Sequence, residues 1–231
     1  MKLLRFRGIT LELHPTFYLL PLLVGWEGWS DGRWHGVAEN LWAIALIYTC
    51  LVLHEFGHAL TAQRLGLPVK HIVLLPIGGM ALLQRMPRKP RTELLITAAG
   101  PAVNFVIAGI CLVLLRGWPP HILRATHPTF HLLGTLRFLL LANLTLGCFN
   151  LLPAYPMDGG RVLRALLAYR LNYLEATRWA LVIGYFVAGS GIVLGLLTGA
   201  YTVVALFLFI LYIGNWEYRQ LRRQEENNSR L

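Results

Sequence analysis

The chain has 231 residues, of which 56% are hydrophobic and only 14% charged, and its net charge is +10. Soluble domains carry about 25% charged residues, so this composition excludes an ordinary soluble protein and indicates an integral membrane protein. Anchoring at anionic lipid headgroups explains the positive charge, and no nucleic-acid partner is expected. The cysteines all lie in apolar stretches and are expected to pack rather than to form disulfides: Cys50, Cys111 and Cys148.

Long apolar stretches predict six membrane-spanning helices in an all-α polytopic protein, and three of these helices lie in the first half of the chain. The first is Leu13–Trp29, which Pro15 and Pro21 interrupt and which is long enough only if it is tilted. The second is Leu41–Leu65, whose second half carries polar residues. The third is Leu94–Leu115, which holds no charge.

The second half of the chain supplies the other three spans. Phe138–Leu152 is the fourth. Trp179–Trp216 is an uncharged run of 38 residues, almost twice the length of one span, so it predicts two helices with a turn near Thr198 and Gly199. The expected organisation is a six-span core at residues 1–216 followed by a basic, polar cytoplasmic tail at 217–231.

The basic residues predict the orientation of these spans. With the N-terminus in the cytoplasm, 17 of the 21 lysines and arginines fall on the cytoplasmic side, where such residues collect. The other four are Arg33, Arg116, Arg124 and Arg137. We therefore expect a multi-pass cell-membrane protein with both termini in the cytoplasm. The start "MKLLRFRG" is not expected to be a cleavable signal peptide, because no small-residue cleavage site closes a short apolar run.

The second span contains the sequence "HEFGH", from His54 to His58. Two histidines four residues apart lie on one face of a helix, so their imidazoles converge on a single metal ion, with Glu55 beside them. This is the HExxH pattern of zinc hydrolases, in which the metal acidifies a bound water and the carboxylate accepts its proton. Because ionisable groups are costly inside a membrane, their presence in a span indicates function. The alternative interpretation is a polar patch or an ion relay between helices.

A catalytic zinc needs a third protein ligand, and "FNLLPAYPMDGGR" provides one in Asp158. At 1.5 Å per residue, His54 lies about 20 Å along the second span and Leu152 about 21 Å along the fourth, so both sites reach a similar depth near the cytoplasmic side. Pro153 and Pro156 are expected to break the helix there, and a tight turn at Gly159 and Gly160 is expected to swing Asp158 toward the histidines.

These motifs together resemble the site-2 proteases, the intramembrane zinc metalloproteases. The resemblance rests on "HEFGH", "GGM", "GPAVN" and "NLLPAYPMDGG" and extends over nearly the whole chain. It implies one Zn²⁺ per chain held by His54, His58 and Asp158, with Glu55 as the catalytic general base. It also implies cleavage of single-span membrane proteins within or near the lipid bilayer. The PDZ and CBS domains of many relatives are not expected here, and the oligomeric state stays open.

The same resemblance implies two substrate-binding elements. Asn150 matches an asparagine near the active site, suited to bonding the substrate backbone or the developing oxyanion. The alternative role for Asn150 is a hydrogen bond between helices. His71–Gln84 is too short for a span and matches a re-entrant β-hairpin, where Gly78 and Gly79 would help to bind an unwound substrate as an added strand. The alternative is a loop that only packs, and for "GPAVN" packing is the favoured role.

Other functions are possible with the same ligands. A metal transporter would need further polar residues lining a path outward, and spans three, five and six carry no carboxylate or histidine for one. A catalytically dead binder would tolerate loss of an active-site group, yet all four are present. A hydrolase acting on a non-peptide amphiphile stays open. Cys50, one turn before His54, would close the zinc site as a fourth ligand, but this departs from the family pattern.

Overall fold

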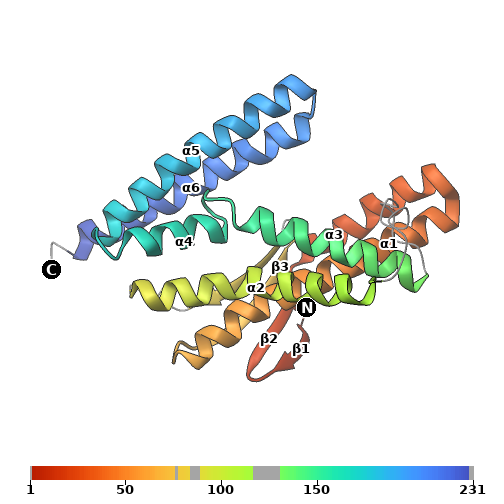
Figure 1. Cartoon of the computed structure of the whole chain (residues 1–231), viewed down its shortest axis with the longest axis horizontal. Coiled ribbons are helices and arrows are strands. Elements are labelled where there is room, and N and C mark those ends of the chain that lie inside the picture. Colours follow the sequence, from red (N-terminus) through yellow and green to blue (C-terminus); the bar gives the residue numbers. More distant parts are fainter. Residues whose placement is uncertain (1, 76–77, 84–88, 117–130, 229–231) are drawn as a thin grey trace. The chain divides into compact units, whose positions relative to one another are not determined.

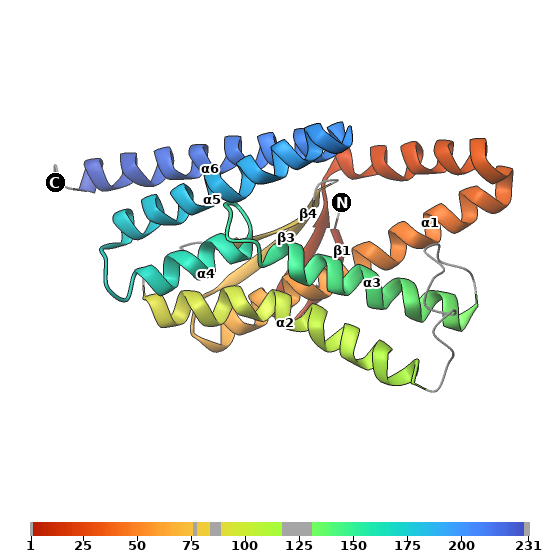
Figure 2. The same ribbon diagram turned by 45° about the horizontal axis from the view of Figure 1, so that its top comes forward.

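The structure is a computed structural model, and it describes residues 2–75, 78–83, 89–116 and 131–228. Side chains are described for these residues except 31, 78–83 and 224–228. The chain divides into two compact units. The first comprises residues 1–85 and 99–147, and the second residues 86–98 and 148–231. Figure 1 labels the α-helices and the strands β1, β2 and β3, and Figure 2 also labels β4.

The first unit contains a four-stranded sheet in the order β1-β2-β3-β4. Its strands are β1 (Lys2–Phe6), β2 (Ile9–Leu13), β3 (Val69–Leu75) and β4 (Gly78–Leu83). The two hairpins, β1–β2 and β3–β4, are antiparallel, and β2 joins them by pairing in parallel with β3. The β3–β4 hairpin confirms that the segment around Gly78 and Gly79 is β-structure, while its depth in a membrane stays a prediction.

The strands β1 and β2 correct the expectation of an all-α protein with one hairpin. Ile9, Leu11 and Leu13 are buried while the residues between them are half-buried, which is the period-two alternation of a strand with one face on a core. Arg7 and Gly8 both have positive φ and form the turn. The alternation in "ITLEL" was the available signal, but five residues are too few to distinguish it from the end of a span.

Helix α1 (Leu19–Arg64) contains a sharp reversal, because Gly32 and Arg33 depart from helical geometry and Arg33 has φ 53°. Figure 2 shows the two arms, at the red and orange end of the chain, running in opposite directions on either side of this reversal. The arms approach closely because they meet at two glycines: a Cβ added to Gly28 would lie 2.6 Å from the carbonyl carbon of Gly36. The long arm, Gly32–Arg64, is apolar enough to cross a membrane and confirms the second predicted span.

The first predicted span, Leu13–Trp29, is not confirmed as a single helix. Leu13 ends β2, and a 3₁₀ turn, η1 (Pro15–Tyr18), precedes the short arm of α1. From Leu19 to the reversal, this arm rises only about 20 Å at 1.5 Å per residue, less than the roughly 30 Å of a bilayer core. Pro15 has no N–H group to continue an earlier helix, which places the helix start after it.

The remaining predicted spans are confirmed as helices. They are α2 (Pro90–Leu114), α3 (Leu132–Asn150), α5 (Tyr173–Thr198) and α6 (Tyr201–Asn228), with the short α4 (Asp158–Leu167) between α3 and α5. Gly199, at φ 70°, ends α5 at the predicted turn. Among the described residues, five helices are therefore long and apolar enough to cross a membrane, counting the long arm of α1.

The second unit packs α5 and α6 against the segment that precedes α4. Figure 2 shows α5 and α6 as antiparallel neighbours. Ala154 and Met157 pack with Ile210 of α6, while Tyr155 packs with Ala180 and Leu181 of α5. These contacts bury Ala154, Tyr155 and Met157 of the non-helical segment between α3 and α4.

An ion pair inside the second unit holds α4 to the first turn of α2. Arg164 is 1% exposed and Glu93 2% exposed, and Nε of Arg164 donates to Oε1 of Glu93 at 2.8 Å. The guanidinium also lies over the rings of Tyr155 and Tyr173, 5.2 and 4.7 Å from their centroids. Burial raises the pKa of Tyr155 well above its usual value, with Arg164 opposing that rise, so its phenol stays neutral. Arg164 thus sets the placement of α4, the helix that Asp158 begins.

Replacing Arg164 by methionine is expected to destabilise the fold by about 3–5 kcal/mol, because it leaves Glu93 as an uncompensated buried charge. Thermal unfolding in detergent, followed by circular dichroism, measures the loss. The double variant Arg164→Met with Glu93→Leu is the control, and it is expected to recover much of the stability. Equal losses in the single and double variants would show that packing, not the isolated charge, is responsible.

Candidate metal centre

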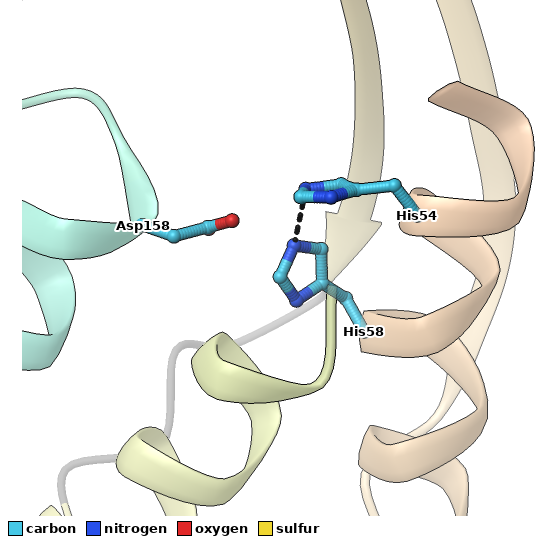
Figure 3. A group of neighbouring side chains, drawn as sticks. All are labelled: His54, His58 and Asp158. Carbon is cyan, nitrogen blue, oxygen red and sulfur yellow. Dashed lines mark hydrogen bonds between the residues drawn. The ribbon is translucent and has the colours of Figure 1, made fainter. Parts of the chain in front are cut away.

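His54 and His58 lie on successive turns of the long arm of α1 and face the same way. The structure buries both, at 3% and 8% exposed, and places their Nε2 atoms 3.0 Å apart. The two rings are nearly perpendicular, at 86° to each other, and Figure 3 shows them joined at their nitrogens by the dashed line. Zinc–nitrogen bonds of about 2.0–2.1 Å in tetrahedral geometry put two ligand nitrogens roughly 3.3 Å apart, so this pair is arranged as two ligands of one ion.

Glu55 follows His54 directly and is also buried, at 9% exposed. Its position on the helix is offset by about 100° from His54, so it lies beside the histidine face and not on it. This is the position that the sequence predicts for a general base next to two metal ligands.

Two glycines bring α2 against the histidines. A Cβ on Gly57 would lie 2.7 Å from the carbonyl oxygen of Ala99, so only glycine lets α1 approach α2 this closely. A Cβ on Gly100 would overlap Nε2 of His58 and lie 2.7 Å from Nε2 of His54. The two imidazoles therefore lie directly against the backbone of Gly100, an arrangement that any side chain at residue 100 would disturb.

A series of hydrogen bonds holds His54 at Nδ1, the ring nitrogen that does not face His58. Its Nδ1 lies 2.6 Å from Oδ1 of Asn104, whose Nδ2 donates to Oδ1 of Asn143 at 2.8 Å. Nδ2 of Asn143 donates in turn to Sγ of Cys50 at 3.1 Å and to the carbonyl oxygen of Leu139 at 2.8 Å. Both asparagines are fully buried.

Sequence reasoning missed the role of these two asparagines. It assigned "GPAVN" to helix packing, and Gly100 does permit a close approach, but Asn104 also contacts a predicted ligand. The available signal was the spacing: Gly100 and Asn104 are four residues apart and so share a helix face. A buried amide in a membrane span must also find a hydrogen-bonding partner.

Asp158 belongs to the second unit and is the first residue of α4, 8% exposed. Figure 3 labels it at the beginning of that helix. The predicted tight turn at Gly159 and Gly160 is wrong, because both are inside the first turn of α4. They are small for another reason. A Cβ on Gly159 would overlap the carbonyls of Leu151 and Leu152, and one on Gly160 would lie 2.9 Å from the carbonyl carbon of Ala154.

The predicted substrate-binding residues lie at the ends of a helix and of a strand. Asn150 is the last residue of α3 and is half-buried. Gly78 and Gly79 begin β4, where they pair with Leu75 and Leu74 of β3. Their positions are compatible with the predicted roles, which stay predictions.

Strand β3 runs along the part of α1 that carries the histidines. Near one end of β3, Nε2 of Gln63 donates to the carbonyl oxygen of Val69 at 3.3 Å. At the other end, the hydroxyl of Tyr48 donates to the carbonyl oxygen of Leu75 at 3.1 Å. Tyr48 and Gln63 lie on either side of His54 and His58 in the sequence of α1. Strand β3 therefore runs alongside the turns of α1 that carry the two histidines.

The fold and the site define a class: a membrane protein whose described residues include five long apolar helices, one of which carries a paired-histidine motif. The model of peptidase family M50 matches residues 42–131 and 117–190. A zinc metalloprotease of Methanocaldococcus jannaschii is 36% identical over 222 residues, which cover 95% of this chain and 60% of that protein. A putative zinc metalloprotease of Synechocystis is 31% identical over 168 residues, 69% of this chain and 42% of that protein.

A solved structure is also similar. The site-2 protease from Methanocaldococcus jannaschii shares 35% identity and aligns with a TM-score of 0.66, over 94% of this chain and 94% of that one. The chain therefore belongs to peptidase family M50, the site-2 protease family. It is a multi-pass membrane protein. It spans less than two thirds of the length of the two metalloproteases named above.

Proposed function

We propose that this chain is a zinc-dependent intramembrane endopeptidase that hydrolyses peptide bonds in the membrane segments of single-span proteins. The observation that carries the proposal is the pair of buried imidazoles, with Nε2 atoms 3.0 Å apart on an apolar helix, and the buried Glu55 beside them. Family membership and the relatives described as zinc metalloproteases support the same activity.

The metal is zinc, and we assign His54, His58 and Asp158 as its ligands. All three are buried, and two imidazoles with one carboxylate form a set that catalytic zinc sites use. Three protein ligands leave a fourth position open, which hydrolysis requires. When bound, zinc supplies Lewis acidity, polarising a carbonyl oxygen and allowing water to ionise near neutral pH.

Glu55 acts as the general base. Its carboxylate accepts a proton from the attacking water and later passes it to the nitrogen of the leaving amine, as general acid–base catalysis requires. Asn150 is proposed to donate its side-chain amide to the substrate backbone or to the developing oxyanion. These roles follow the HExxH and NxxPxxPxDGG patterns of the sequence.

The β3–β4 hairpin is proposed to hold the substrate. A protease binds its substrate extended, and β4 is an edge strand of the sheet order β1-β2-β3-β4. Because β3 follows α1 from Gln63 to Tyr48, a segment added to β4 would run past the level of the histidines. Gly78 and Gly79, at the start of β4, allow another backbone to approach closely.

The active site is proposed to face the cytoplasmic side of a cell membrane, with both termini in the cytoplasm and the lipid bilayer as solvent for the helices. The basis is the excess of lysine and arginine in the segments assigned to that side. Membrane-protein substrates are the expected partners.

Purified chain in detergent, offered tagged single-span substrates, tests the proposal. We expect about one zinc per chain by elemental analysis and cleavage within a span by mass spectrometry. Zinc without cleavage of any substrate would favour a binding protein. Folded protein that takes up no zinc would overturn the proposal.

Asp158→Ala is expected to weaken zinc binding and reduce turnover together, because it removes a ligand. Metal titration and cleavage rates on the same preparation measure both losses. Glu175→Ala, a change of an acidic residue in the first turn of α5, is the matched control and should alter neither. Full zinc affinity in Asp158→Ala would exclude it as a ligand.

A further inference from the structure

The hydrogen-bond chain behind His54 has a fixed direction. The carbonyl oxygen of Leu139 can only accept, so the group of Asn143 that faces it at 2.8 Å must be the Nδ2 amide. That amide also donates to Sγ of Cys50, which uses both of its hydrogens. Oδ1 of Asn143 is therefore the atom that faces Asn104.

The direction passes on to the histidine. Since Oδ1 of Asn143 accepts, the group of Asn104 at 2.8 Å from it must be the Nδ2 amide, which turns Oδ1 of Asn104 toward His54. An oxygen at 2.6 Å from Nδ1 of His54 requires that this nitrogen carry the proton. The imidazole then has its lone pair on Nε2, the atom that faces His58.

We infer that Asn104 and Asn143 are positioning residues for the metal centre, which hold His54 as the Nδ1–H tautomer and aim its Nε2 lone pair at the ion. The inference deepens the function proposed above and rests on it. Partners of this kind orient metal-binding histidines, and their loss costs about 10–100-fold in metal affinity. Here the partner is a neutral amide anchored to a helix carbonyl, which sets the tautomer without adding a charge to the membrane interior.

Cys50 has a different place in this arrangement. Its sulfur accepts a hydrogen bond from Asn143, so it is separated from His54 by both asparagines in the series of hydrogen bonds. The carbonyl of Leu139 alone fixes the direction of Asn143, so Cys50 is dispensable for the tautomer. This separates Cys50 from the alternative role of a fourth metal ligand.

The test compares Asn104→Leu with the native chain by two measurements on the full-length protein in detergent. The first is zinc affinity by competition with a chelator, where we expect a loss of about 10–100-fold. The second is the ¹⁵N spectrum of histidine-labelled, metal-free protein, with the His54 signals assigned by their absence from His54→Gln. The native chain is expected to show a protonated Nδ1, and Asn104→Leu a mixture of tautomers.

Matched variants separate positioning from simple loss of stability. Asn40→Leu removes another half-buried asparagine of the same unit, one that donates to the carbonyl of Val24 at 3.2 Å, and should leave both readouts native. Asn104→Asp keeps an oxygen opposite Nδ1 but loses the donor to Oδ1 of Asn143, so it is expected to recover only part of the zinc affinity that Asn104→Leu loses. Cys50→Ala should bind zinc as the native chain does.

Two results would overturn the inference: zinc affinity in Asn104→Leu equal to that in Asn40→Leu, or a native His54 that is protonated at Nε2. Failure of the proposed function gives a different result. The native chain would then bind no zinc, while the spectrum of metal-free protein would still report the tautomer that the asparagines impose.

Discussion

Glu55→Gln is expected to lower the rate of peptide hydrolysis by about 10²–10⁴-fold while zinc stays bound, because the amide cannot accept the proton that general-base catalysis transfers. Glutamine has nearly the same shape as glutamate, and the position is buried beside His54, so the two imidazoles keep their places. Zinc content by elemental analysis and initial cleavage rates on a single-span substrate measure the two quantities separately.

Glu39→Gln is the matched control for this variant. Glu39 lies on the same arm of α1 and pairs with His35 at 3.3 Å, toward the other end of that arm from the HEFGH segment. The Glu39→Gln variant should cleave the substrate at the native rate. Native turnover in Glu55→Gln would contradict the role of Glu55 as base, and loss of zinc in that variant would instead indicate a structural part for the carboxylate.

Gly100→Ala is expected to reduce zinc affinity at least as much as the loss of a supporting residue does, about 10–100-fold. The added methyl would overlap Nε2 of His58 and come within 2.7 Å of Nε2 of His54, so it would force both imidazoles away from their present positions. The clash is relieved only if the imidazoles leave the arrangement that places their Nε2 atoms 3.0 Å apart. Chelator competition measures the affinity.

Gly109→Ala controls for the effect of alanine in α2. A Cβ at Gly109 meets no atom within 4 Å, so this substitution should leave zinc binding unchanged. Removing a helix-interior glycine is also expected to stabilise the fold by about 0.5–1 kcal/mol. If Gly100→Ala binds zinc as tightly as Gly109→Ala, zinc binding does not require the close contact between the two imidazoles and Gly100.

Features that depend on neighbours in sequence were predictable. The two histidines face one way because they are four residues apart on a helix, and that spacing is visible in "HEFGH". The turn at Gly199 follows from the length of the apolar run and from the left-handed conformation that glycine adopts there. The first predicted span was less secure, since two prolines and a strand end share a segment that composition alone marks as apolar.

The sequence by itself determined five of the predicted apolar helices and the pair of histidines on one face of α1, because apolar length and helical periodicity are local properties of the chain. Only the tertiary structure decided what surrounds the ligands. Asn104 and Asn143 lie 50 and 89 residues beyond His54, and the parallel pairing of β2 with β3 joins Thr10 to His71. Such contacts arise where folded helices and strands meet, and the direction of hydrogen bonds across them depends on a single carbonyl, that of Leu139.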